Sequence, residues 1–140
     1  MGQKRMAVVI IVGLVVMMGM LLATTGCERQ VEIKNLDEPY HFQPEDIWDG
    51  VWVEGLSYEI TDDNELIVRG KLVNESDTTW YGVTLEFYLE DEDGNTATVS
   101  EETPITDSLK PGGFRHFELE MRPPSEPATF TYGFIIRGIR

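Results

Sequence analysis

Polar and apolar residues alternate along most of the chain after residue 50, and this period of two is the pattern of half-buried β-strands. The alternation is clearest between residues 80 and 90, where every second side chain is large and apolar. It predicts six strands, at 51–60, 65–74, 80–90, 96–100, 114–121 and 128–137. Residues 103–108 are ambiguous. Because no helical stripe accompanies the strands, we expect an all-β domain.

Turn-forming residues separate the predicted strands. Asp62-Asp63-Asn64 tolerates a left-handed backbone, Asp93-Gly94 is a hairpin signal, and Pro111-Gly112 suits a tight turn. Short alternating strands joined by such turns indicate an antiparallel sandwich or barrel. The side chains expected to face its core are Leu56, Tyr58, Ile60, Leu66, Val68, Leu72, Tyr81, Val83, Leu85, Phe87, Leu89, Phe117, Leu119, Met121, Phe130, Tyr132, Phe134 and Ile136.

The first 26 residues differ from the rest of the chain. Lys4 and Arg5 precede a run from residue 6 to residue 26 that carries no charge. A short basic end followed by an apolar run is typical of an export signal or a membrane anchor. Since the positive end stays on the cytoplasmic side, the remainder of the chain is expected on the extracytoplasmic face of the cell membrane.

The apolar run ends in Leu22-Ala23-Thr24-Thr25-Gly26-Cys27, and Cys27 is the one cysteine of the chain. This segment resembles the lipobox of prokaryotic lipoproteins. The resemblance implies a covalent diacylglycerol on the Cys27 thiol and cleavage just before it. The alternative is an uncleaved spanning helix, because about 20 apolar residues cross a bilayer. Both alternatives anchor the protein to the membrane at its N-terminus, either by lipid or by a single pass.

Residues 27–50 are polar and acidic, interrupted by Pro39 and Pro44, and they predict a tether with one helical turn at 45–50. A pure linker rarely carries three aromatic residues. We therefore expect Tyr40, Phe42 and Trp48 to pack the later half of the tether on a domain that spans residues 51–140.

The acidic balance of the chain excludes some partners. Its formal charge is −14, and cleavage before Cys27 would remove Lys4 and Arg5, giving 9 − 25 = −16 over 114 residues. Such a surface disfavours binding to nucleic acid or to anionic lipid headgroups. With a single cysteine no internal disulfide can form, so the core alone must hold the fold.

Four segments of the predicted domain occur in a fixed order: Gly70-Lys71-Leu72-Val73-Asn74-Glu75-Ser76, Tyr81-Gly82-Val83, Phe87-Tyr88-Leu89-Glu90-Asp91 with Asp93-Gly94, and Leu109-Lys110-Pro111-Gly112. Together they resemble the FxLyD domain, an immunoglobulin-like β-sandwich of prokaryotic surface lipoproteins. Glu90 stands where the family motif Phe-x-Leu-Tyr-Asp has its tyrosine. The resemblance implies the sandwich fold and a cell-envelope location, and it carries no catalytic residues.

Acidic loops are the main candidates for ion binding. Asp91, Asp93 and Asn95 place oxygen ligands around a glycine turn, which a hard cation such as calcium prefers. The spaced ligands of a twelve-residue calcium loop do not follow, so a hairpin turn with solvated acids is the competing interpretation. His41 and His116 would need carboxylates to complete a zinc site. No other metal or cofactor is indicated.

Catalytic motifs are missing from the sequence. It contains no Gly-x-Ser-x-Gly turn and no phosphate-binding glycine pattern, so we expect no enzyme. Asn74-Glu75-Ser76 is formally a glycosylation site, but the resemblance favours a structural role for Asn74 as part of the fold pattern. Trp52, Trp80 and Tyr88 are candidates for an exposed binding surface, and the favoured alternative is that they cover an open sheet edge. We therefore expect a non-catalytic accessory module that meets unidentified envelope proteins, for instance by strand addition at 96–100. The alternative is an ion- or small-ligand-binding lipoprotein that uses its acidic loops.

Overall fold

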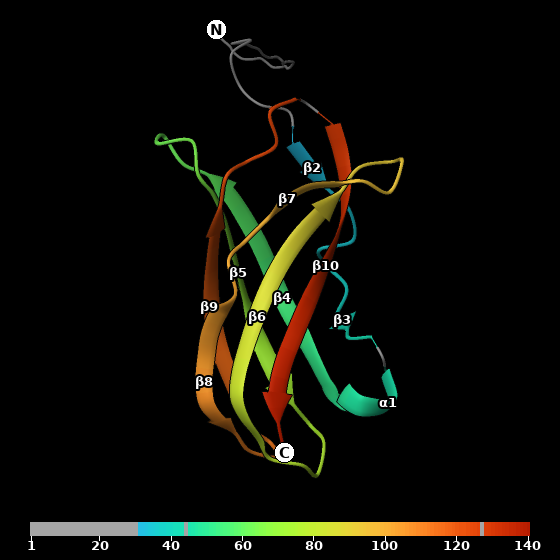
Figure 1. Cartoon of the computed structure of the whole chain (residues 1–140), viewed down its shortest axis with the longest axis vertical. Coiled ribbons are helices and arrows are strands. Elements are labelled where there is room, and N and C mark those ends of the chain that lie inside the picture. The colour runs from blue at the N-terminus through green and yellow to red at the C-terminus, as the bar shows by residue number, and fades with distance from the viewer. Residues whose placement is uncertain (1–30, 44, 127) are drawn as a thin grey trace, which may run out of the picture. The chain divides into compact units, whose positions relative to one another are not determined.

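The computed structural model describes residues 31–43, 45–126 and 128–140 (Figure 1). The chain divides into two units, Met1–Gln30 and Val31–Arg140, and the description concerns the second. The predicted signal or anchor at 1–26 and the candidate lipid-bearing residue Cys27 lie outside the described residues. Within the described part, no helix is long and apolar enough to cross a membrane.

The described unit is all-β, with one short helix. Its strands form two sheets, and the chain passes repeatedly from one sheet to the other. The elements are β2 (Val31–Ile33), β3 (Tyr40–His41), α1 (Glu45–Trp48), β4 (Val51–Ile60), β5 (Leu66–Asn74), β6 (Trp80–Glu90), β7 (Thr96–Val99), β8 (Thr103–Leu109), β9 (Phe114–Met121) and β10 (Ala128–Ile139).

One sheet has the order β3-β4-β5-β9 and is antiparallel throughout. The other has the order β2-β10-β6-β7, and β8 also pairs with β6, at the opposite end of β6 from β7. The strand β2 runs parallel to β10, and the remaining pairs of this sheet are antiparallel. The sheet is therefore mixed, with β2 at its edge beside the first residues of β10.

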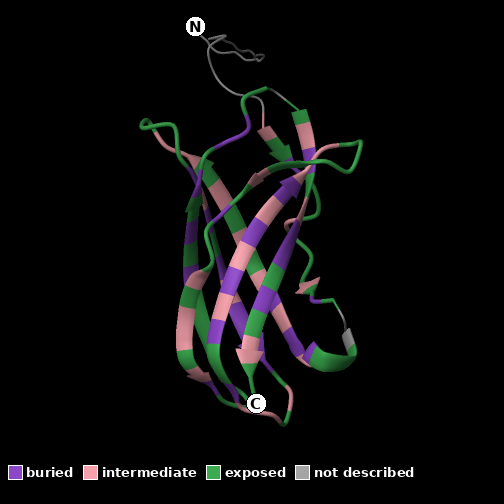
Figure 2. Cartoon of the chain, in the orientation of Figure 1, coloured by how far each residue is buried: buried purple, intermediate pink, exposed green. Residues whose placement is uncertain are grey.

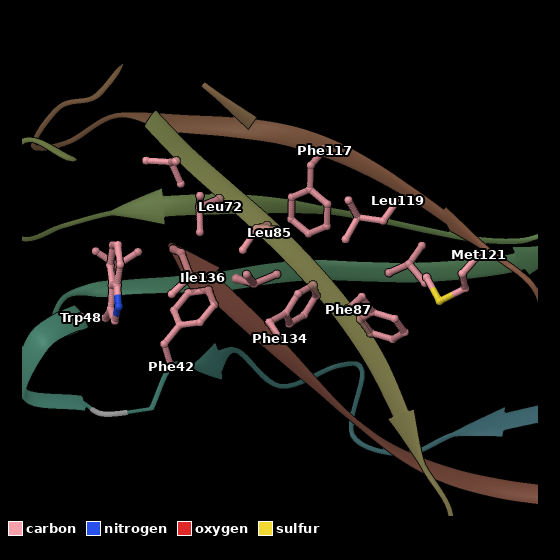
Figure 3. Close-up of a cluster of buried hydrophobic side chains, with 14 of the residues drawn as sticks. Phe42, Trp48, Leu72, Leu85, Phe87, Phe117, Leu119, Met121, Phe134 and Ile136 are labelled. Carbon is pink, nitrogen blue, oxygen red and sulfur yellow. The ribbon is translucent and has the colours of Figure 1, made fainter. Parts of the chain in front are cut away.

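The two sheets enclose one hydrophobic core. Buried and exposed residues alternate along most strands, as the banding in Figure 2 shows. Phe134 of β10 lies at the centre of an aromatic group, with ring centroids 5.1 Å from Phe87, 5.8 Å from Phe117 and 6.4 Å from Phe42 (Figure 3). These four rings come from both sheets and from the segment before α1, so they join the layers through apolar contact.

The observed strands follow the predicted ones closely. The bounds of β4, β6 and β9 equal the predictions, β5 and β7 differ by one residue at one end, and β10 extends two residues beyond residue 137. The ambiguous residues 103–108 belong to β8. Most of the predicted inward-facing side chains are buried or pack on the core.

Tyr81 is the exception: it was expected in the core but is half exposed. Gly82 adopts a positive φ of 60°, and the register between β6 and β10 shifts at this point. The extra residue of this β-bulge turns both Tyr81 and Gly82 outward and leaves Trp80 buried. Period-two reasoning therefore assigned Tyr81 to the wrong face, because it assumed an unbroken ladder.

The segment predicted as a tether forms part of the packed unit, which begins at Val31 rather than at residue 51. Ile33, Phe42 and Trp48 are buried in the core. The Trp48 ring stacks on the Trp80 ring with centroids 3.8 Å apart, which fixes α1 against the start of β6. The expected packing of Phe42 and Trp48 is confirmed, and Ile33 adds to it from the earlier half of the segment.

Candidate binding face

The candidate calcium residues lie in the turn between β6 and β7, where they serve the backbone. The Asp91 carboxylate oxygen Oδ1 accepts hydrogen bonds from the backbone N–H groups of Asp93 and Asn95, each 2.9 Å long. The backbone N–H of Asp91 donates to the Asn95 carbonyl oxygen at 2.9 Å. Asp91 therefore closes the hairpin, and one of its oxygens is already committed to that role.

The described residues contain no group of three histidine, cysteine or acidic side chains that could hold a metal ion. The turn at Asp62-Asp63-Asn64 projects from the same end of the sandwich as the Asp91 turn, but on the other side of it (Figure 1). The structure brings the acids of these two turns into one region of the molecule without joining them in a single cluster.

Asn74, the asparagine of the glycosylation triplet, is fully buried. Its Nδ2 donates to the carbonyl oxygens of Thr78 at 2.8 Å and Leu109 at 3.0 Å, and its Oδ1 accepts from the backbone N–H of Ser76 at 2.9 Å. Its backbone N–H donates to the Gly113 carbonyl oxygen. One side chain thus joins the β5–β6 loop to the end of β8, and its amide is not available for glycosylation in the folded protein.

A hollow of about 660 Å³ lies on the outer side of the β4-β5-β9 layer. Two glycines are among the residues that line it. Gly55 sits at a register shift between β4 and β5 with φ of 66°, and it presents no side chain. A Cβ on Gly70 would lie 2.8 Å from side-chain atoms of both Leu56 and Phe117, so glycine is required for these two residues to pack there.

We call the side chains around this hollow the β5 face. They come from three adjacent strands, and the register places them in rows across the sheet. Four charged side chains and His116 line the hollow. Two aromatic side chains lie in the next row of the sheet. The residues of the β5 face are Trp52, Glu54, Arg69, Lys71, Phe114, His116 and Glu118.

The charged groups of the β5 face neutralise one another across strands. Arg69 bridges Glu59 and Glu118 with two contacts of 2.7 Å, and the Lys71 ammonium lies 3.4 Å from Glu54. The carboxylates raise the pKa of the Arg69 guanidinium, Glu59 first and then Glu118. All these groups are well exposed, so each pair adds little stability and mainly sets the position of its side chains.

Trp52 and Phe114 form an aromatic rim beside the charged rows. The Trp52 indole Nε1 donates to Glu54 Oε1 at 2.7 Å, and this hydrogen bond, followed by that from Lys71, lowers the pKa of the Glu54 carboxyl. The Lys71 ammonium lies 5.1 Å from the centre of the half-exposed Phe114 ring, within cation–π range. The rim side chains are therefore held in place before any partner arrives.

The β5 face combines an open hollow, paired charges and aromatic side chains. Its hollow is open to solvent, its charges are paired, and its aromatic groups lie at the margin. Of the aromatic candidates from the sequence, Trp52 belongs to this face, whereas Trp80 is buried in the core. His116 also belongs to it and His41 lies beside Trp52, with ring centroids 6.1 Å apart.

Sequence reasoning missed Lys71, Arg69 and Phe114 as members of one surface. The available signal was the outward parity of Arg69 and Lys71 on a predicted strand. It did not show that β9 lies next to β5 or that a hollow separates their rows.

Comparison of the chain with protein-family models, with characterised proteins and with solved structures gave no match.

Proposed function

We propose that this protein is a non-catalytic binding module of the prokaryotic cell envelope. In this proposal residues 31–140 are an immunoglobulin-like, FxLyD-type sandwich, and the N-terminal segment anchors it to the extracytoplasmic face of the cell membrane. Its partners are other envelope proteins. The observation that carries the binding role is the β5 face, a hollow of paired charges with a fixed aromatic rim on an acidic domain.

The immunoglobulin-like assignment is supported by the roles of the four resembling segments. Asn74 of the first segment is hydrogen-bonded to Leu109 of the last. Gly82 of the second provides the bulge of β6. In the third, Phe87 and Leu89 enter the core and Asp91 closes the following turn. These residues bond between strands, form a bulge, fill the core or close a turn, and such structural roles are what a fold-defining motif requires.

Crossings between the layers give further support. The chain leaves the four-stranded sheet after β5 for β6, returns at β9 and leaves again for β10. Such crossings between two antiparallel layers are the connections of an immunoglobulin-like sandwich. The parallel strand β2 at the edge of β10 is an addition to this plan.

The anchor is tested by the intact mass of the detergent-extracted protein beside a Cys27→Ala variant. We expect a chain that begins at Cys27 and carries acyl mass, and we expect this species to disappear in the variant. An uncut chain of unmodified mass in both samples would indicate a spanning helix and would exclude lipidation. A chain found only in the soluble fraction would contradict both forms of the anchor.

The binding role is tested by a photocrosslinking residue placed at Lys71, on the β5 face. A matched control carries the same residue at Thr131, which is exposed on β10 of the other sheet. We expect one discrete adduct with an envelope protein from position 71 that is absent from position 131. Substitution of Trp52 by Ala should weaken that adduct without unfolding the domain. Equal adducts from both positions, or none from position 71, would contradict the proposal.

A further inference from the structure

The edge strands of this domain differ in how they are protected. Within the described residues β2, β3 and β7 are two to four residues long, too short for extended pairing. The longer β8 contains Pro104, and its ladder to β6 shifts register near Thr84. By contrast, β9 is eight residues long, contains no proline or glycine, and has β5 as its one ladder partner in the described structure. The stretches of β4 and β10 beyond their short pairings with β3 and β2 are also open, but they contain Gly55 and Gly133, respectively. The strand β9 is therefore the one long edge of the described structure without proline or glycine.

The direction of the β9 backbone groups follows from its pairing with β5. The Asn74 N–H donates to the Gly113 carbonyl oxygen, and the register pairs Leu72 with Arg115. Because bonded and non-bonded pairs alternate in an antiparallel ladder, residues 115, 117, 119 and 121 bond to β5. The N–H and C=O groups of residues 114, 116, 118 and 120 point to the open edge.

Space is available on both sides of this edge. The hollow of the β5 face includes His116 and Glu118. A second hollow of about 610 Å³ lies along the later half of β9, where Glu118 and Glu120 oppose Glu101 and Thr103. Edge strands of soluble proteins are commonly shielded by a covering loop or helix. Beside β9, the strand β8 approaches without pairing to it, and the two hollows leave space along the edge.

The edge is complementary to itself. Its first half carries Arg115 and His116, and its second half carries Glu118 and Glu120. An antiparallel partner strand of the same sequence, centred on Phe117, would place His116 opposite Glu118 of the second copy. The same pairing would occur twice, because a two-fold axis relates the copies.

We propose that two copies of this chain associate by antiparallel pairing of their β9 edges, joining two four-stranded layers into one continuous sheet. The proposal does not depend on the anchor. It uses His116 and Glu118 of the β5 face, but it does not require that face to bind an envelope protein. In this register the outward-directed residues 116 and 118 exchange hydrogen bonds with residues 118 and 116 of the second copy. Along the outer row the order becomes Glu54, Lys71, His116, then Glu118 and Arg69 of the second copy.

Neighbouring registers are worse. Shifting the strands by two residues in one direction places His116 opposite itself, so that it loses Glu118 as its partner. Shifting them in the other direction places Glu118 opposite itself, and like charges directly opposite on a sheet are destabilising. A shift by one residue would place backbone groups that point to the open edge opposite groups that already bond to β5, so the two strands could not exchange hydrogen bonds.

Arg115 adds a second complementarity. In the centred register it lies opposite Leu119 of the second copy, next to the hollow formed by Glu101, Glu118 and Glu120. Its side chain is exposed and makes a hydrogen bond to the carbonyl oxygen of the adjacent Phe114. The Arg115 cation of each copy would thus lie near the acidic hollow of the other, which offsets part of the repulsion between two acidic chains.

Cysteine crosslinking tests the register. The full chain with Cys27→Ala has no cysteine left, so any disulfide that forms must involve the engineered cysteines. One preparation carries His116→Cys and another Glu118→Cys, both at exposed positions. We expect a disulfide-linked dimer when the two preparations are mixed in detergent and oxidised, and none from either alone, because bonded pairs place Cα atoms about 5.5 Å apart. A Thr96→Cys and Thr98→Cys mixture on the short edge β7 is the matched control and should stay monomeric.

Either single preparation crosslinking as strongly as the mixture would contradict the register and overturn the proposal. A second measurement uses chains without engineered cysteines in sedimentation. His116→Glu should weaken the dimer roughly tenfold, and the swap His116→Glu with Glu118→His should restore it. A Cys27→Ala chain that stays monomeric up to the highest soluble concentration would also overturn the proposed dimer. The β9 edge would then be open to pairing with a strand from another protein. Failure of the photocrosslinking at Lys71 would not affect this result.

Discussion

The phenol of Tyr88 on β6 lies directly against the backbone of Gly133 on β10, in the space that a Cβ at position 133 would occupy. The two residues are cross-strand partners on the outer side of the five-stranded sheet. Glycine is therefore needed at position 133 because of its neighbour, not because of its own backbone conformation.

This contact predicts that Gly133→Ala destabilises the domain by about 1–3 kcal/mol, because the tyrosine ring must move aside. Thermal or urea unfolding monitored by circular dichroism measures the change. In a Tyr88→Ala background the same substitution should cost much less, since the two residues are coupled. Equal costs in both backgrounds would show that the contact does not constrain position 133.

Two tyrosines should ionise late. Burial is the main cause that raises the pKa of both Tyr88 and Tyr132, and the neighbouring Tyr40 adds to it. A raised folded-state pKa contributes stability that is present below the ordinary value of about 10 and is lost as the pH rises through the folded-state pKa. We expect stability to fall above about pH 10, and Tyr88→Phe to remove one late step from the absorbance titration. A titration unchanged by that substitution would contradict the assignment.

Asn74 should be among the least replaceable polar residues. Asn74→Ala removes the amide that bonds to the buried Leu109 carbonyl oxygen, to the part-buried Thr78 carbonyl oxygen and to the Ser76 N–H, and we expect a loss of about 2–4 kcal/mol. Denaturant unfolding provides the value. Asn95→Ala is the matched control, because the hydrogen bonds shown for Asn95 are made by its backbone, and it should change stability by less than about 0.5 kcal/mol.

The extent of the domain can be checked by truncation. A chain beginning at residue 51 lacks Ile33, Phe42 and Trp48, which are buried in the core. We expect it to unfold at a much lower temperature than a chain beginning at residue 31, since loss of one large buried side chain costs about 3–5 kcal/mol. Near-ultraviolet circular dichroism should also lose the signal of the Trp48–Trp80 stack. Equal unfolding temperatures for the two chains would mean that residues 31–50 add no stability, as the predicted tether requires.

Calcium is expected to leave the thermal midpoint unchanged relative to magnesium at the same ionic strength. A specific site filled at 100 times its Kd would add about 2.7 kcal/mol. Asp91 already directs one oxygen to two backbone N–H groups, so little of the turn is free for a cation. A calcium-specific rise that disappears in Asp91→Asn with Asp93→Asn would establish the ion-binding alternative.

The sequence by itself determined the strands and most of their buried faces. A period-two pattern depends on neighbouring residues alone, which is why β4, β6 and β9 could be bounded from the chain and why Phe87, Leu119 and Phe134 were assigned correctly to the core. Sequence also indicated the turns, because Asp93-Gly94 and Pro111-Gly112 encode local backbone geometry.

Tertiary structure decided what depends on residues that meet from distant parts of the chain. The bulge at Gly82 exposes Tyr81, and Ile33 packs on strands far along the sequence. The β5 face exists because β9 pairs with β5 across 49 positions between Arg69 and Glu118. Local periodicity carries no information about which strands become neighbours, so the hollow and the open β9 edge follow from the packing of the two sheets.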